Sequence, residues 1–234
     1  MALRPLPAGF LATRLALHRV AERLVAPARK PDNEIALFVT PGGFGTPEFE
    51  FGAARHRVRV DGIELVHETD GEDERVALTT LGDGAEFLGA GLIADPPDGA
   101  ADPLDLDPES ARALAEYYAF ADAALERLRA AAAGDDPSEA ILWPEHFDVA
   151  IEAGSEDAGT RANYGASPGD GEHPEPYLYV GPWVEQRTDA GEVWNATAFA
   201  GAELSYAELV AADDPLAVAA EFLSSRRAAL ESSG

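Results

Sequence analysis

The sequence has 234 residues, enough for one large domain or two small packed halves, and 46% of them are hydrophobic, which excludes a disordered chain. With 43 acidic and 17 basic residues the formal net charge is -26, and such a chain repels phosphate backbones and anionic membrane surfaces. The lack of cysteine excludes disulfides, zinc–thiolate sites, iron–sulfur clusters and cysteine nucleophiles. The composition therefore predicts a globular protein that binds neither nucleic acid nor membranes.

The basic residues are almost all arginines, because Lys30 is the only lysine. Scarce lysine with abundant Asp, Glu, Ala and Gly is typical of a high-GC bacterium or of a salt-adapted organism, and the composition does not separate the two. The first 24 residues contain no apolar run of signal-peptide length, and no segment approaches the ~18 apolar residues of a membrane span. We expect a soluble, cytoplasmic protein.

In the first third of the chain, apolar residues at three- and four-residue spacing predict a helix over 10–26 that ends at Pro27 and Pro31, with His18 as a packed histidine. Residues 34–40 and 75–81 read as strands, and Asp61-Gly62 joins two alternating runs as a tight hairpin. Alternation places Arg55, Arg57 and Arg59 on one face, which we interpret as the solvated face of an edge strand.

The stretch "TPGGFGT" (40–46) lacks the G-x-x-x-x-G-K-[ST] pattern of a phosphate loop, and no predicted helix follows it. Its glycines are more typical of a hairpin or a bulge. Ser167 lacks a G-x-S-x-G context, so a serine nucleophile elbow is not predicted either.

Residues 94–106 are rich in Pro, Asp and Gly and form the best internal boundary. A helix follows, with Asp107 as its N-cap, Pro108 at its first position and Gly134 past its end. The remaining predicted elements are strands at 141–152, 160–166, 176–184 and 192–200, and a helix from Asp214-Pro215 to about Leu230.

Strands cluster rather than alternate with helices, which favours an α+β fold with antiparallel sheets and three main helices. We expect a single compact body over 1–234. Its two halves, 1–93 and 107–234, share the order helix then strands, which leaves a distant duplication open.

The first candidate site is the stretch "LWPEHFDVAIE" (142–152). In a continuous strand, His146 and Asp148 point the same way, and His-x-Asp pairs of this kind supply two facial ligands to a metal. His173 is then the third ligand, and Glu145 or Asp148 assists His146 as general base. The structural alternative is an exposed surface pair with no metal.

The second candidate is "RANYGASPGDGEHPEPYLYVGPW" (161–183), whose aromatic and polar residues punctuated by Gly and Pro are typical of a ligand-contacting loop. Alternation places Arg161 with Asn163, and Tyr177 with Tyr179, on shared strand faces. The structural alternative is a long connection whose aromatic residues close the core. The predicted ligand-binding residues are Trp143, Asn163, Tyr164, Tyr177 and Trp183.

Five strings, "PGGFGTP", "LDLDP", "LWPEHFD", "RANYGASPGD" and "PEPYLYVGPW", resemble a family of uncharacterised proteins from actinobacteria and similar high-GC prokaryotes. The resemblance covers about residues 5 to 230. It implies a cytoplasmic prokaryotic protein and transfers no activity, cofactor or catalytic residue.

Two functions follow as hypotheses. The preferred one is a non-catalytic small-molecule-binding or interaction protein, because the aromatic and polar cluster lacks a complete catalytic set. The alternative is an enzyme with a general base or metal site at His146 and Asp148. The sequence specifies neither a cofactor nor an oligomeric state.

Overall fold

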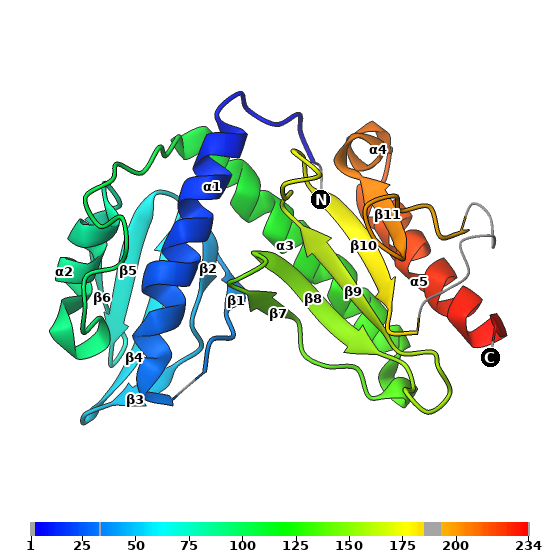
Figure 1. Cartoon of the computed structure of the whole chain (residues 1–234), viewed down its shortest axis with the longest axis horizontal. Helices are drawn as coiled ribbons and strands as arrows, with labels where there is room; N and C mark the ends of the chain where they lie inside the picture. Colours follow the sequence, from blue (N-terminus) through cyan, green and yellow to red (C-terminus); the bar gives the residue numbers. More distant parts are fainter. Residues whose placement is uncertain (1–2, 33, 185–192, 234) are drawn as a thin grey trace. The chain divides into compact units, whose positions relative to one another are not determined.

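The computed structural model describes residues 3–32, 34–184 and 193–233, and it confirms the predicted α+β fold with two antiparallel sheets (Figure 1). The chain divides into two compact units. The N-terminal unit comprises Leu6–Ala119 and Leu142–Phe147, and the C-terminal unit comprises Met1–Pro5, Phe120–Ile141 and Asp148–Gly234. The segment 94–106 lies inside the N-terminal unit, and the division falls within the long central helix.

The N-terminal unit begins with three joined helical segments of different pitch. Helix α1 (Phe10–Val20) continues as a π-helix, η1 (Ala21–Val25), and then as a 3₁₀-helix, η2 (Ala26–Asp32). The helix predicted over 10–26 is therefore confirmed, but Pro27 does not end it. Pro27 lies in the first turn of η2, where the missing N–H of proline is tolerated.

The sheet of this unit has the order β1-β2-β4-β5-β6, with β3 paired to β4. Val58, Val60 and Leu65 of this sheet are buried, as are Leu24 and Leu81 of the helices, and β4 packs against η1. The tight hairpin at Asp61-Gly62 is confirmed, and Gly43–Gly45 forms a strand rather than part of a long turn. The strand bounds are Phe38–Thr40 (β1), Gly43–Gly45 (β2), Phe49–Phe51 (β3), Ala54–Asp61 (β4), Glu64–Thr69 (β5) and Glu72–Ala77 (β6).

The three arginines of β4 lie on one face, as predicted, but β4 is an inner strand. Each arginine pairs with carboxylates: Arg59 with Asp61 and Asp73, Arg57 with Glu68, and Arg55 with Glu48. The basic cluster is thus neutralised within its own sheet.

Helix α2 (Leu81–Leu92) was not predicted from the sequence, because it contains four glycines and glycine disfavours helix interiors. Thr80 caps it by accepting a hydrogen bond from the backbone N–H of Asp83. Gly84 faces the core, where an added Cβ would lie 2.6 Å from Leu24. Close packing of the helix on the core therefore accounts for at least this glycine.

Helix α3 (Pro108–Ala131) agrees with its prediction, and the cap is confirmed because Asp107 accepts hydrogen bonds from the backbone N–H and the hydroxyl of Ser110. The second sheet has the order β11-β10-β9-β8-β7. Its strand bounds are Ile141–Trp143 (β7), Asp148–Ala153 (β8), Ala162–Ser167 (β9), Tyr177–Pro182 (β10) and Ala202–Ser205 (β11).

In the C-terminal unit, α3 passes behind the sheet in the view of Figure 1, and α5 (Pro215–Ser233) packs against β10 and β11. The side chains on the helix-facing side of this sheet are fully buried: Val149, Ile151, Tyr164, Leu178 and Val180. The final predicted helix is confirmed. The short helix α4 (Tyr206–Ala211), which starts at a capping box between Ser205 and Glu208, was missed.

The strand predicted at 192–200 is wrong where the structure describes it. Glu192 lies outside the described residues, and 193–200 contain turns and bends, with the strand displaced to Ala202–Ser205. No helix in the described part of the chain is both long and apolar enough to cross a membrane.

Candidate functional site

The stretch "LWPEHFD" is interrupted by a turn, so the continuous strand predicted over 141–152 is wrong. Residues 144–147 turn between β7 and β8, and Phe147 has a left-handed backbone with φ 57°. The Phe147 N–H donates to the Trp143 carbonyl at 2.7 Å, and the Tyr118 hydroxyl donates to the Phe147 carbonyl at 2.7 Å. His18 stacks on the Phe147 ring at 4.9 Å, which agrees with its prediction as a packed histidine.

This turn removes the geometric premise of the first candidate site. Glu145 and His146 are exposed in the turn and belong to the N-terminal unit, whereas Asp148 is buried at the start of β8 in the C-terminal unit. His146 and Asp148 therefore do not share a strand face. Trp143 also lies in the N-terminal unit.

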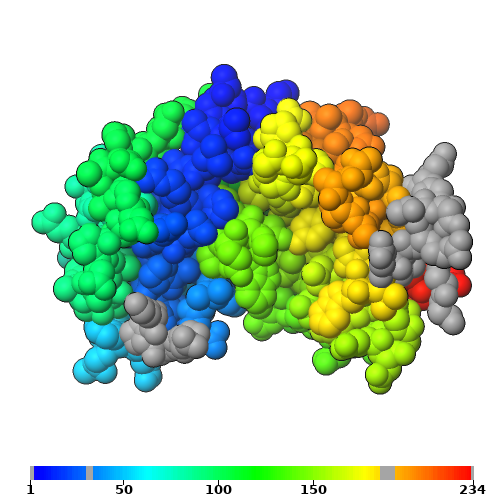
Figure 2. All heavy atoms as spheres, in the orientation of Figure 1, coloured from blue at the N-terminus to red at the C-terminus, as the bar shows by residue number. Residues whose placement is uncertain are grey.

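The side of the second sheet that points away from α5 carries the aromatic and polar side chains of the second candidate. We call this surface the tyrosine face and define it as Asp148 and Ala150 of β8, Asn163, Gly165 and Ser167 of β9, Tyr177 and Tyr179 of β10, and Glu203 of β11. The register places Gly165 opposite both Ala150 and Tyr179, and Tyr179 opposite Glu203. Figure 2 shows residues from this stretch of the chain, in yellow-green and yellow, at the surface.

Tyr179 lies flat across Gly165 and reaches β8, where its hydroxyl donates a hydrogen bond to Asp148. A Cβ added at Gly165 would lie 2.3 Å from Cζ of Tyr179, so any side chain there would displace the ring. Position 165 therefore has to be glycine for the Tyr179 ring to lie where it does. Phe199 packs edge-on against Tyr179 at 6.2 Å.

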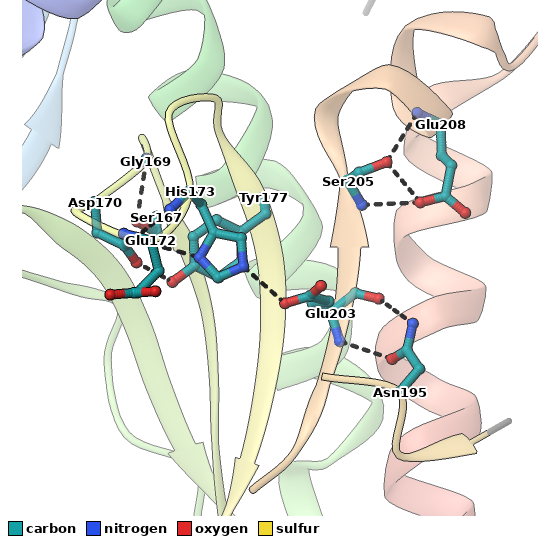
Figure 3. A network of polar contacts seen from close by, with 10 residues as sticks. All are labelled: Ser167, Gly169, Asp170, Glu172, His173, Tyr177, Asn195, Glu203, Ser205 and Glu208. Atoms are coloured by element: carbon teal, nitrogen blue, oxygen red, sulfur yellow. Dashed lines mark hydrogen bonds and ion pairs between the residues drawn. The ribbon is translucent and has the colours of Figure 1, made fainter. Parts of the chain in front are cut away.

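A second set of contacts surrounds His173, as Figure 3 shows. The Tyr177 hydroxyl donates to Oδ2 of Asp170 at 2.6 Å, and the two His173 ring nitrogens lie 3.3 Å from Oδ1 of Asp170 and 3.0 Å from Oε2 of Glu203. The rings of His173 and Tyr177 are 4.3 Å apart. Three segments of the C-terminal unit thus meet through one imidazole.

Burial, followed by the hydrogen bond to Asp170, raises the pKa of Tyr177 well above its usual range. Burial also tends to raise the pKa of Asp170. The hydrogen bonds that this carboxylate accepts from Tyr177 and from the backbone N–H groups of His173 and Glu172 outweigh that effect, so its pKa is lowered. Tyr177 is therefore neutral and Asp170 ionised at neutral pH.

His173 was predicted as a third metal ligand beside His146 and Asp148. The structure surrounds it with Asp170 and Glu203 instead, and both ring nitrogens are engaged. Within residues 3–32, 34–184 and 193–233, no group of three or more His, Asp or Glu side chains is arranged to hold a metal ion.

At the far end of the same side of the sheet, two of the predicted ligand-binding residues meet. The Trp183 indole N–H donates to Oδ1 of Asn163 at 3.0 Å, and the Arg161 guanidinium lies 4.9 Å from the Trp183 ring centroid. Arg161 also pairs with Glu152 at 2.7 Å. Trp183 is 46% exposed.

Tyr164, also predicted to bind ligand, points to the other side of the sheet and is fully buried. Burial, chiefly, raises its pKa to about 12. The sequence reading missed Asp170 and Glu203. The D-x-x-H spacing of Asp170 and His173 could have indicated that these two side chains interact. Glu203 could not be found, because the last strand was predicted at 192–200 instead of Ala202–Ser205.

A scan against protein-family models, a search of curated proteins and a search of solved structures found no match to this chain. The resemblance to an uncharacterised high-GC prokaryotic family therefore stays a prediction, and the functional assignment depends on the geometry of the site alone.

Proposed function

We propose that the protein is a non-catalytic small-molecule-binding protein and that the tyrosine face, with the neighbouring Trp183, is its binding surface. The observation that carries this proposal is the fixed orientation of the aromatic rings. Tyr177, Tyr179 and Trp183 each donate a hydrogen bond to a side chain of the same unit. Rings held in this way lose little conformational entropy on binding, and their faces offer stacking area to a planar ligand.

The same hydrogen bonds argue against catalysis at this surface. A general base needs a free nitrogen or oxygen within reach of the substrate proton, but both ring nitrogens of His173 face carboxylates. The alternative of an enzyme with a base or metal at His146 and Asp148 has lost its premise, because the turn at 144–147 separates the two residues. No contact of the described residues favours that alternative.

The proposal is tested by NMR on protein labelled with ¹³C in its tyrosine rings, titrated with a library of planar small molecules. A ligand of the tyrosine face should shift the Tyr177 and Tyr179 resonances and leave Tyr117 and Tyr118, which are buried in the N-terminal unit, unchanged. Shifts confined to the N-terminal unit, or none with any compound, would contradict the proposal.

Two glycine variants supply a matched control. Gly165→Ala should displace Tyr179 and weaken binding at least about tenfold, because a 1 Å misplacement of a fixed contact is costly. Gly134→Ala adds the same methyl group in the 3₁₀-helix η3 (Ala133–Asp135) of the same unit, outside the tyrosine face, where nothing lies within 4 Å, and should bind as wild type does. Trp183→Leu, at an exposed position, tests the aromatic contact without disturbing the core. Equal binding by wild type and all three variants would place the ligand elsewhere.

A further inference from the structure

The N-terminal unit contains a hollow of about 370 Å³ beside the π-helix η1. Its apolar walls come from Ala26 and Pro27 of η2, from Ile35, and from Pro144 of the turn that precedes β8. Hollows of this size are typical of sites for small organic molecules. Ile35 is 48% exposed, so an apolar side chain faces open space at this position.

The local backbone holds the two sides of the hollow in place. In η1 the N–H of Ala26 donates to the carbonyl of Ala21, five residues earlier, and this wide turn presents Glu22 and Ala26 to the hollow. On the other side, a ring nitrogen of His18 lies 2.9 Å from the Pro144 carbonyl. These contacts fix the helical wall and Pro144, whereas Glu34 and Ile35 come from the segment that leads into β1.

Three carboxylates, those of Glu22, Glu34 and Glu145, complete the lining. No ion pair or hydrogen bond joins the side chains of these glutamates to any residue that the structure describes. The hollow thus combines apolar walls with three carboxylates.

We propose that this hollow is a binding site for a small organic cation, an ammonium group that carries a short apolar tail. The tail would cover Ile35 and the two prolines, and the ammonium would face the three glutamates. This site is independent of the tyrosine face, because all of its lining residues belong to the N-terminal unit.

The test uses three probes of one shape: 2-phenylethylammonium, neutral 2-phenylethanol and anionic 3-phenylpropionate. Binding is followed by the methyl resonances of isoleucine, with Ile35 as the site reporter and the buried Ile151 of the C-terminal unit as the control. We expect the ammonium to shift Ile35 with a dissociation constant on the order of a millimolar or below, and to bind at least about tenfold more tightly than the alcohol. Equal affinity for the alcohol and the ammonium would overturn the proposal.

Charge variants distinguish this site from the general attraction of an acidic protein for cations. Glu22→Gln, Glu34→Gln and Glu145→Gln should each weaken ammonium binding roughly two- to fivefold, the effect of one partly exposed charge. Glu86→Gln makes the same change on the exposed side of α2 and should leave the affinity unaltered. If Glu86→Gln weakened binding as much as the other three variants, the attraction would be non-specific and the proposal would fail.

Discussion

Two fully buried tyrosines, one in each unit, show how differently the same hydroxyl can be placed. The Tyr118 hydroxyl donates at 2.7 Å to the carbonyl of Phe147, the residue with the left-handed backbone. The Tyr164 hydroxyl is buried and makes no hydrogen bond to a described residue. A buried polar group without a hydrogen-bond partner lowers the stability of the folded protein. Removing the donor of a buried acceptor does the same, because the acceptor is then left without a partner.

This contrast predicts opposite results for one chemical change. Tyr118→Phe should lower the free energy of unfolding by about 1–3 kcal/mol, because the Phe147 carbonyl loses its donor. Tyr164→Phe should leave the free energy of unfolding within about 0.5 kcal/mol of wild type or raise it. Urea unfolding followed by circular dichroism measures both. A large loss of stability in Tyr164→Phe would show that its hydroxyl has a partner after all.

Tyr164 also predicts how stability depends on pH under alkaline conditions. Its pKa is raised from 10.0 to about 12 in the folded state, so between these values the folded protein holds more protons than the unfolded chain. The stability that this group contributes is present below pH 10 and is lost as the pH rises toward 12. Tyr164→Phe should show a shallower alkaline loss than wild type in urea midpoints taken at pH 9 to 11.

For single residues, the sequence predicted correctly which side chains share a face of the sheet wherever the predicted strand exists in the structure. Alternation placed Tyr177 with Tyr179 on a shared face, and the register agrees. It failed for His146 and Asp148 because Phe147 adopts a positive φ, which is rare for an aromatic residue and which no alternation pattern reveals. The pairing of Asp170 and Glu203 through His173 depends on tertiary folding and was beyond the pattern.

Among the elements, the strand pair β4–β5 carries a pH-sensitive contact. Nδ1 of His56 and Nε2 of His67 lie 2.9 Å apart, with Thr69 and Phe87 against them. Burial, then the charge of His56, lowers the pKa of His67, while Glu74 acts in the opposite direction. Two imidazoles at this distance share a hydrogen bond only while at least one is neutral.

We therefore expect the N-terminal unit to lose stability as the pH falls. Because the pKa of His67 is lower in the folded state than its ordinary 6.5, the unfolded chain binds more protons, and the stabilisation present above pH 6.5 is lost below it. His67→Gln should remove part of this dependence in unfolding curves measured between pH 7 and 5. His146→Gln, at an exposed turn position, is the control and should retain the wild-type slope.

The elements themselves were predicted to different degrees. Helices with caps and apolar periodicity were found: the starts of α3 and α5 were predicted to the residue, and their ends to within about three residues. Helix α2 was missed because its glycines argue against a helix by propensity, and tertiary packing overrides that preference. The chain stretch 141–152 was read as one strand because its apolar residues alternate, although the four residues of the turn interrupt it.

For the whole molecule, the net charge of -26 is the dominant electrostatic fact. Mutual repulsion among surface carboxylates opposes the compact state, and salt screens it. We expect the urea midpoint to rise between about 0.01 M and about 1 M NaCl, over which the Debye length falls from about 30 to about 3 Å. Urea is the appropriate denaturant because guanidinium chloride is itself a salt.

The same measurement separates the two origins that the composition leaves open. A salt-adapted protein should unfold when salt is removed, whereas an acidic protein of ordinary high-GC composition should stay folded at about 0.01 M NaCl with a lower midpoint. The fold class follows from the clustering of strands and was predictable. The division into two units does not coincide with the predicted boundary at 94–106, because it runs through the middle of α3.

The π-helix η1 sets the direction in which the helical wall of the hollow faces. A π turn contains one residue more than an α turn, so every helical position after it is rotated by about 100° relative to an uninterrupted α-helix. Loss of a single codon within Ala21–Val25 would restore α-helical pitch and swing Ala26 and Pro27 away from the hollow that they line. Deleting one of these five residues should therefore abolish ammonium binding at the hollow even though every lining side chain is kept.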